Sequence, residues 1–256
     1  MSCSSRCGRY NRIAKTNRPA PLTNIEQLVR VRSLPFILAV PTVFFEKEVM
    51  PMQTFTEGVV DKSIEVARRN WKSWHDVFEY GSDPGNPLLS DPQRFALFLR
   101  EYSVRRTIRA GTHERFRQVL AVKSRELAEI KNGNAGQFID VVEADLRADF
   151  GTCEGTRKVV SAVSKVAAFL RPDRYLAWDK YGKRGANIAL NRGASSDFST
   201  YAEYLAICDE IWDGSPGELI RQMSEERAES PIEKELRFQR RVLDFCLMIL
   251  GGRSFR

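Results

Sequence analysis

The chain has 256 residues, of which 43% are hydrophobic, and it carries a formal net charge of +7. This length and apolar content suffice for a sizeable core and exclude a chain that is disordered throughout. Because no stretch of about 18 apolar residues occurs, a membrane-spanning helix is also excluded, and we expect a soluble protein.

The first 50 residues differ from the rest of the chain. They are basic, rich in serine and interrupted by proline, and residues 1–32 hold seven Arg or Lys residues against Glu26 alone, a net charge of +6. We therefore expect residues 1–50 to form a basic, flexible N-terminal extension and residues 51–256 to form a helical domain.

Apolar residues recur at helical spacing through this domain. Asp91 and Pro92 have the pattern of a helix N-cap and first residue, Thr112 opens a further helix, and residues 137–150 have one apolar face. No strand-like alternation longer than a few residues is present, so the predicted fold class is all-α. The clearest stripe, which predicts a core-facing helix before the turn at residues 81–85, comprises Val60, Ile64, Ala67, Trp71, Trp74 and Phe78.

Three capping-box patterns predict three helices in the last quarter of the chain. The second and third boxes also have proline at the first helical position, where its φ suits a helix. The pairs are Thr200 with Glu203, Ser215 with Glu218, and Ser230 with Glu233.

The most informative stretch is residues 155–190, GTRKVVSAVSKVAAFLRPDRYLAWDKYGKRGANIAL. It predicts a helix of small and apolar residues with Ser164 and Lys165 on one face, followed by a basic and aromatic turn. One acidic residue, Asp179, comes directly after this turn and before a further basic helix.

This order of a helix, the turn RPDRYLAW, an Asp and a basic helix resembles the second half of the helix-hairpin-helix DNA glycosylases. The resemblance covers roughly residues 137–190 and implies a two-lobed helical fold. In that superfamily the Asp after the hairpin helix is the catalytic carboxylate, and Asp179 is the matching position. The chain departs from the family at the hairpin, where the usual Leu-Pro-Gly-Val-Gly-like turn is replaced by FGTCEGT at residues 150–156.

The resemblance also raises the question of a nucleophilic lysine. Members of the superfamily with lyase activity carry one at the start of the helix after the hairpin, and Lys158 lies near that place, with Lys165 as a second candidate. We expect a monofunctional enzyme that hydrolyses the glycosidic bond without Schiff-base chemistry. In the alternative interpretation, Asp179 only caps a helix and Lys158 only contacts phosphates.

Other side chains of this region are candidates for binding a flipped-out base and the DNA backbone. The expected base pocket comprises Trp178, Lys165 and Tyr175, although aromatic residues at such positions also fit a protein core. The arginines at 105, 106 and 109 alternatively stabilise the C-terminus of a helix. The expected DNA contacts are Gly151, Gly155, Thr156, Arg157, Arg105, Arg106, Arg109, Lys180, Lys183 and Arg184.

Cysteine and histidine contents limit cofactor chemistry and localisation. The five cysteines are odd in number and widely scattered, which is atypical of a disulfide framework and fits the reducing cytoplasm, where we expect the protein to reside. They lack the clustered spacing of the iron–sulfur glycosylases, and only His75 and His113 exist. We therefore expect no iron–sulfur cluster, no metal and no cofactor, and we expect a monomer.

The sequence thus predicts a DNA glycosylase that binds double-stranded DNA, flips out a modified or damaged base and excises it to leave an abasic site. Some relatives of this type act in bacterial defence by removing glucosylated hydroxymethylcytosine from phage DNA, which makes that base one expected substrate. Two alternatives remain. One is a non-catalytic helical DNA- or RNA-binding module in which residues 151–158 bind phosphates, and the other is a helical adaptor that binds proteins.

Overall fold

The computed structural model describes residues 55–130, 134–151, 159–193 and 197–255, all within one compact unit, Glu48–Arg256. In these residues the secondary structure is helical, apart from an isolated antiparallel bridge between Ile108 and Gly151. The predicted all-α fold class is therefore confirmed. The basic N-terminal extension lies outside the described residues.

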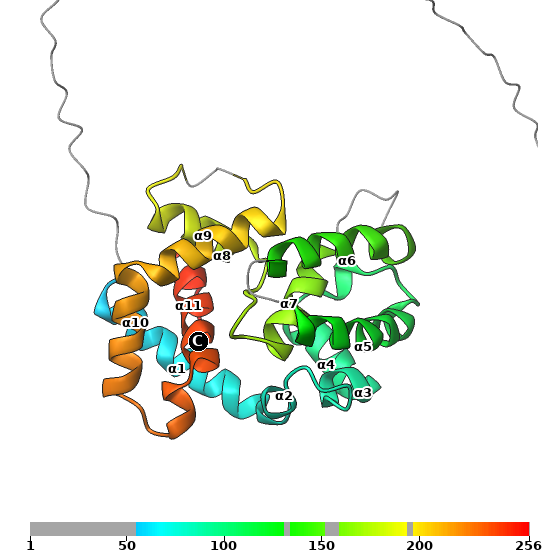
Figure 1. The fold of residues 1–256 in the computed structure, drawn as a ribbon, viewed down its shortest axis with the longest axis horizontal. Helices are drawn as coiled ribbons and strands as arrows, with labels where there is room; N and C mark the ends of the chain where they lie inside the picture. The colour runs from blue at the N-terminus through cyan, green and yellow to red at the C-terminus, as the bar shows by residue number, and fades with distance from the viewer. Residues whose placement is uncertain (1–54, 131–133, 152–158, 194–196, 256) are drawn as a thin grey trace, which may run out of the picture. The chain divides into compact units, whose positions relative to one another are not determined.

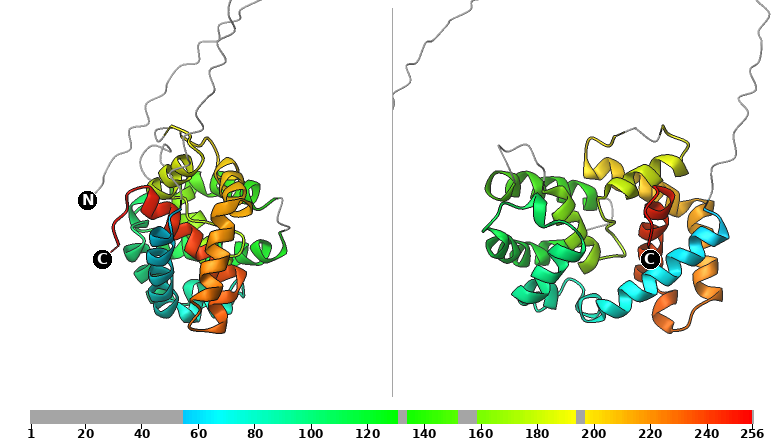
Figure 2. Two further views of the ribbon diagram at one scale, coloured as in Figure 1. Left: turned by 90° about the vertical axis from the view of Figure 1, so that its left-hand side faces the viewer. Right: turned by 180° about the vertical axis from the view of Figure 1, so that it is seen from behind.

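The helices of this unit fall into two groups (Figure 1), and the view from behind shows the same division (Figure 2). The first group comprises α2 (His75–Tyr80), α3 (Pro87–Ser90), α4 (Pro92–Glu101), α5 (His113–Glu129), α6 (Ala135–Phe150) and α7 (Val160–Leu170). The second comprises α1 (Glu57–Ser73), α8 (Lys180–Ala189), α9 (Tyr201–Asp213), α10 (Ser215–Glu226) and α11 (Leu236–Leu250). Two short 3₁₀ helices are η1 (Arg105–Thr107) and η3 (Pro231–Lys234). None of the described helices is long and apolar enough to cross a membrane.

The predicted apolar stripe of α1 lies in the core, but the helix is interrupted within it. Thr56 caps α1 by accepting a hydrogen bond from the backbone N–H of Val59. The helix ends before Trp74, whose φ of −125° lies outside the helical region, and α2 begins at the next residue. Trp74 is 1% exposed and packs edge to face on Phe169. Trp74 lies between the two helices and is buried in the core that both of them face. The apolar stripe therefore continues across the break.

Helices α8 and α11 touch through their backbones. A Cβ atom at Gly185 would overlap the carbonyl oxygen of Leu247, and one at Gly251 would overlap that of Tyr181. Both positions therefore require glycine for this close approach. As a result, the start of α8 lies directly beside the C-terminal part of α11.

The three capping-box predictions have three different outcomes. The Thr200 hydroxyl accepts from the backbone N–H of Glu203 at 3.1 Å, so the first is confirmed as the cap of α9. Helix α10 begins at Ser215 itself with Gly214 as the N-cap, so Ser215 is not a cap. The third box precedes only η3, and α11 begins later, at Leu236.

The third prediction is confirmed only in part: Ser230 is the N-cap of the short η3, which begins at Pro231, but its side chain makes no capping hydrogen bond, and the carboxylate of Glu233 has other partners. It accepts from the Arg68 guanidinium at 2.8 Å and from the backbone N–H of Glu229 at 3.2 Å. It therefore closes the loop before α11 and binds it to α1.

Candidate active site

Lys165 is the one charged residue of α7, whose other residues are small or apolar. Its side chain is almost completely buried, and its amine donates to the backbone carbonyl of Tyr102 at 3.1 Å and to Oδ2 of Asp179 at 3.3 Å. A buried ammonium group is costly unless it is paired. These two oxygens provide its pairing, and they direct the amine toward Asp179.

Asp179 combines this ion pair with a structural role. It is the N-cap of α8, and its Oδ1 accepts from the backbone N–H of Tyr181 at 2.9 Å. Its Oδ2 binds Lys165. The start of helix α8 and the amine of Lys165 therefore both face this carboxylate. The capping role predicted as an alternative is therefore confirmed, and it coexists with the contact to Lys165.

The segment that leads into Asp179 is held by side chains from other helices. The hydroxyl of Tyr201 accepts from the backbone N–H of Leu176 at 3.1 Å and donates to its carbonyl at 2.7 Å. The hydroxyl of Tyr204 donates to the carbonyl of Ala177 at 3.3 Å. Helix α9 thus fixes the backbone of the residues just before Asp179.

Helix α11 and helix α7 complete this support. Asp244, which is 1% exposed, accepts from the backbone N–H of Ala177 at 3.4 Å and pairs with the guanidinium of Arg241. The Ser164 hydroxyl accepts from the backbone N–H of Trp178 at 3.0 Å. Because the buried backbone groups here find partners on three helices, the position of Asp179 is set by the whole core rather than by its own loop.

The surroundings of Lys165 favour loss of its proton. Burial lowers the pKa of Lys165 below its usual value, and the nearby Arg253 guanidinium lowers it further, although Asp179 and Asp244 act in the opposite direction. A lysine whose pKa is lowered in this way has a larger fraction of neutral, nucleophilic amine near neutral pH.

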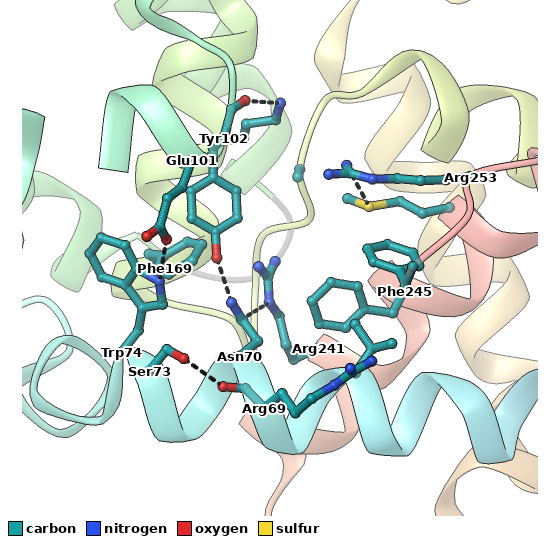
Figure 3. Close-up of a pocket in the computed structure, with 15 residues that line it drawn as sticks. Arg69, Asn70, Ser73, Trp74, Glu101, Tyr102, Phe169, Arg241, Phe245 and Arg253 are labelled. Atoms are coloured by element: carbon teal, nitrogen blue, oxygen red, sulfur yellow. Dashed lines mark hydrogen bonds between the residues drawn. The ribbon is translucent and has the colours of Figure 1, made fainter. Parts of the chain in front are cut away.

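A cavity of about 340 Å³ lies beside Lys165 and is shown in Figure 3. This volume falls in the range of about 300–1,000 Å³ that is typical of small-molecule sites. It is lined by residues of α1, of the end of α4, and of α7 and α11. Its aromatic lining comprises Trp74, Tyr102, Phe169, Phe245 and Phe255.

Polar groups in this cavity are connected by a hydrogen-bond relay from α11 to α4. Arg241 Nε donates to Oδ1 of Asn70 at 3.1 Å, and Nδ2 of Asn70 donates to the Tyr102 hydroxyl. Beside it, Oε2 of Glu101 accepts from the indole N–H of Trp74 at 3.2 Å. Figure 3 shows the side chains of Glu101 and Tyr102 pointing toward α1 side by side.

Of the three residues predicted for a base pocket, the structure places only Lys165 in this cavity. Tyr175 is 1% exposed and belongs to the core. Trp178 lines a separate, smaller hollow of about 140 Å³, which it shares with Tyr201. Its ring also contacts the amine of Lys183, which lies 4.6 Å from the ring centroid.

The predicted DNA contacts are only partly described. Arg105, Arg106 and Arg109 are exposed and lie together around η1. Arg109 donates to the carbonyl of Ala148 at 3.2 Å, close to the end of α6, which supports the alternative role at a helix C-terminus. Gly155, Thr156, Arg157 and Lys158 lie outside the described residues.

The predicted basic residues of α8 and the glycine before the hairpin differ in their surroundings. Lys180 and Arg184 are exposed, whereas Lys183 pairs with Asp197 at 2.6 Å. Gly151 is buried and forms the isolated bridge with Ile108.

Several residues of the cavity were not identified from the sequence. Asn70, Tyr102 and Arg241 lie on three different helices or helix ends and have no local motif. The sequence did contain one indication of this network: two charged residues, Arg241 and Asp244, lie in the apolar, buried stretch of α11. Charged residues in such a stretch indicate a buried polar network.

Metal-ligating side chains do not gather in the described part of the chain: it holds no group of three or more His, Cys, Asp or Glu residues placed to bind a metal ion. Cys208 and Cys246 are buried free thiols. Comparison of the chain with protein-family models, curated proteins and solved structures returns no match. The function therefore has to be inferred from the site.

Proposed function

We propose that the protein is a DNA glycosylase in which Asp179 and Lys165 act together on the sugar of a flipped-out nucleotide. The observation that carries this proposal is the contact of 3.3 Å between the Lys165 amine and Asp179, in which Lys165 also lines a cavity with aromatic walls. A nucleophile, a carboxylate and a pocket of suitable size are the groups that base excision requires.

The chemistry assigned to the two residues follows from their charges. As the glycosidic bond breaks, positive charge develops on the sugar, and the Asp179 carboxylate stabilises it. The neutral amine of Lys165 attacks C1′, and the electron pair of the C–N bond leaves with the base. The attached amine then loses one proton to solvent, and the released base takes one up from solvent. Ring opening converts the new amine linkage into a Schiff base, which water hydrolyses to free the enzyme.

This covalent route differs from the monofunctional one expected from the sequence. What favours it is the place of Lys165, because a lysine buried against the carboxylate and lowered in pKa is suited to nucleophilic attack. In the hydrolytic route Asp179 would instead activate a water molecule. Lys158, the other lysine candidate, stays a prediction.

Borohydride trapping separates these routes. Duplexes that each carry one damaged or modified base, including glucosylated hydroxymethylcytosine, are incubated with protein, and abasic sites and reduced protein–DNA adducts are measured. We expect both products with the natural protein, and neither with Asp179→Asn or Lys165→Gln. Lys62→Gln, which changes an exposed lysine of α1, is the matched control and should behave like the natural protein.

Three outcomes would change the proposal. Abasic sites without a trapped adduct, together with full activity of Lys165→Gln, would establish the hydrolytic route. An adduct that persists in Lys165→Gln would move the nucleophile to another lysine such as Lys158. Failure to excise any base, with salt-sensitive DNA binding retained in Asp179→Asn, would favour the non-catalytic binding module.

The remaining expectations belong to the same proposal. Double-stranded DNA is the proposed partner. Glucosylated hydroxymethylcytosine, a substrate that the sequence predicts, carries an amino group, and the selectivity argued below disfavours it. A monomeric state and a cytoplasmic location likewise remain predictions, and the free thiols of Cys208 and Cys246 are compatible with a reducing compartment.

A further inference from the structure

The cavity beside Lys165 has one polar edge, formed by two neighbouring residues at the end of α4. Glu101 is the last residue of α4 and Tyr102 is its C-cap, and both line the cavity. Trp74 and Phe169 lie against them as apolar walls. Whether each of these two groups donates or accepts a hydrogen bond determines which edge of a ligand fits against them.

The relay from α11 makes the Tyr102 hydroxyl a donor. Arg241 can only donate, so its bond to Asn70 must end on the amide oxygen and the amide nitrogen must face Tyr102. This nitrogen can also only donate, so the Tyr102 oxygen accepts and its own proton remains available for a bond to a ligand in the cavity that Tyr102 lines. The pairing of Arg241 with buried Asp244 anchors the relay in the core.

Glu101, in contrast to Tyr102, provides a hydrogen-bond acceptor. Its Oε2 accepts from Trp74 at 3.2 Å, and its Oε1 has no hydrogen-bond donor within the part of the chain that the structure describes. An ionised carboxylate can only accept. The edge therefore offers one donor, on Tyr102, and one acceptor, on Glu101.

The two groups also lie at different depths. Glu101 is exposed, whereas the Tyr102 hydroxyl lies on a relay that ends at Arg241, which is 2% exposed. The atom of a base that protrudes furthest is its exocyclic substituent. A base entering this cavity therefore places that substituent against Tyr102 and the adjacent ring nitrogen against Glu101.

We propose that, given the glycosylase function on which this inference rests, the cavity selects bases with a carbonyl group next to a ring N–H. The carbonyl oxygen accepts from Tyr102, and the ring N–H donates to Glu101. Hypoxanthine, uracil and 8-oxoguanine have such an edge. Adenine and cytosine types present an amino group to the Tyr102 hydroxyl and a lone pair to the Glu101 carboxylate, so both contacts are unfavourable.

The charged side chains that line the cavity also favour bases with a carbonyl group. Three arginines line it, Arg69, Arg241 and Arg253, of which Arg241 is paired with buried Asp244, and Glu101 is the one carboxylate among the described lining residues. When the glycosidic bond breaks, its electron pair moves onto the base and the negative charge spreads to the carbonyl oxygen. The Tyr102 O–H and the cationic lining stabilise that oxygen, and a proton from solvent then neutralises the released base.

The test compares bases that differ only at this edge. Single-turnover excision is measured on duplexes with hypoxanthine or adenine opposite cytosine, and with uracil or cytosine opposite adenine. We expect the carbonyl-bearing member of each pair to react at least about 100-fold faster, because a mismatched edge forms neither the hydrogen bond to Tyr102 nor the one to Glu101. Duplexes with N6-methyladenine and with glucosylated hydroxymethylcytosine extend the amino series.

Tyr102→Phe identifies the donor. It should lower the rate for the carbonyl bases by about 100-fold and leave the slow rate for the amino bases nearly unchanged. A variant that is merely less well folded would lower both rates together, so the ratio of rates is the decisive measurement. Tyr80→Phe, which changes a tyrosine that is 52% exposed on α2, should leave the ratio unchanged.

The results distinguish a failure of the proposed base selectivity from a failure of the proposed glycosylase activity. Preferential excision of the amino bases, or an unchanged ratio in Tyr102→Phe, would overturn the inference and leave the glycosylase proposal standing. If no duplex of either series yields abasic sites, the glycosylase proposal fails and the inference fails with it.

Discussion

Tyr201 pairs both polar backbone groups of Leu176, although the two residues are 25 positions apart in the chain. One hydroxyl thus replaces the hydrogen bonds that a strand or helix would give to an extended segment. Because Asp179 follows three residues later, the rigidity of this pairing extends to the candidate active site.

Tyr201→Phe should therefore destabilise the protein and impair the site. The substitution leaves the N–H and the carbonyl of Leu176 buried without their partner, and each such group costs about 1–3 kcal/mol. We expect the free energy of unfolding, measured in urea, to fall by about 2–6 kcal/mol. Tyr80→Phe on the surface should change it by less than about 0.5 kcal/mol, and an equal loss in both variants would contradict the assigned role.

Gly185→Ala should separate α8 from α11. The added Cβ would meet backbone rather than a movable side chain, because the nearest atom is the carbonyl oxygen of Leu247. We expect a loss of unfolding free energy of at least about 1–3 kcal/mol. Gly58→Ala, in an open place on α1, is the control and should stabilise slightly through its higher helix propensity. Similar melting temperatures for both variants would show that α8 and α11 can move apart to accommodate the added Cβ atom without loss of stability.

The rate of adduct formation should rise with pH along a curve whose midpoint lies below 10.5, the ordinary pKa of lysine. Burial lowers the pKa of Lys165, and the groups facing it from other elements are Asp179, Asp244 and Arg253. Between the lowered pKa and 10.5 the unfolded state binds more protons than the folded state, so unfolding free energy should also rise with pH there. Both dependences are measured in the natural protein and in Lys165→Gln, which should lack this contribution to stability. A rate that rises only above pH 10.5 would contradict the prediction.

Replacing Arg105, Arg106 and Arg109 by glutamine should weaken DNA binding without regard to sequence. If each arginine neutralises one phosphate, the slope of log affinity against log salt concentration should become shallower by about three. The control is Lys62→Gln with Lys72→Gln, which removes exposed positive charge from α1. An unchanged slope in the triple variant would place the DNA on another surface.

The sequence predicted those parts of the fold that arise from local pattern. The stripe of α1 is buried because an apolar face at helical spacing can only be satisfied by a core. Asp91 caps α4 by accepting from the backbone N–H of Gln93, as its place before a proline predicts. The interruption at Trp74 had no such signal, and the ring of Trp74 packs on Phe169, which is distant in sequence.

The candidate site was less predictable for the same reason. Asp179 stands in a local motif, and its position as a helix cap follows from the residues around it. The relay of Asn70, Tyr102 and Arg241 joins residues that are 32 and 171 positions apart. Only the tertiary structure brings them together, and only the tertiary structure selects Lys165 as the lysine beside Asp179.

The cavity draws its walls from α1 and from α11, the first and the last helices of the described chain. While the protein is being synthesised, α1 leaves the ribosome long before α11 is made. Lys165 and Asp179 then lack Arg241, Asp244 and Phe245, so the nascent chain has no completed cavity. Any activity of the site therefore begins only after α11 has emerged and packed against α1.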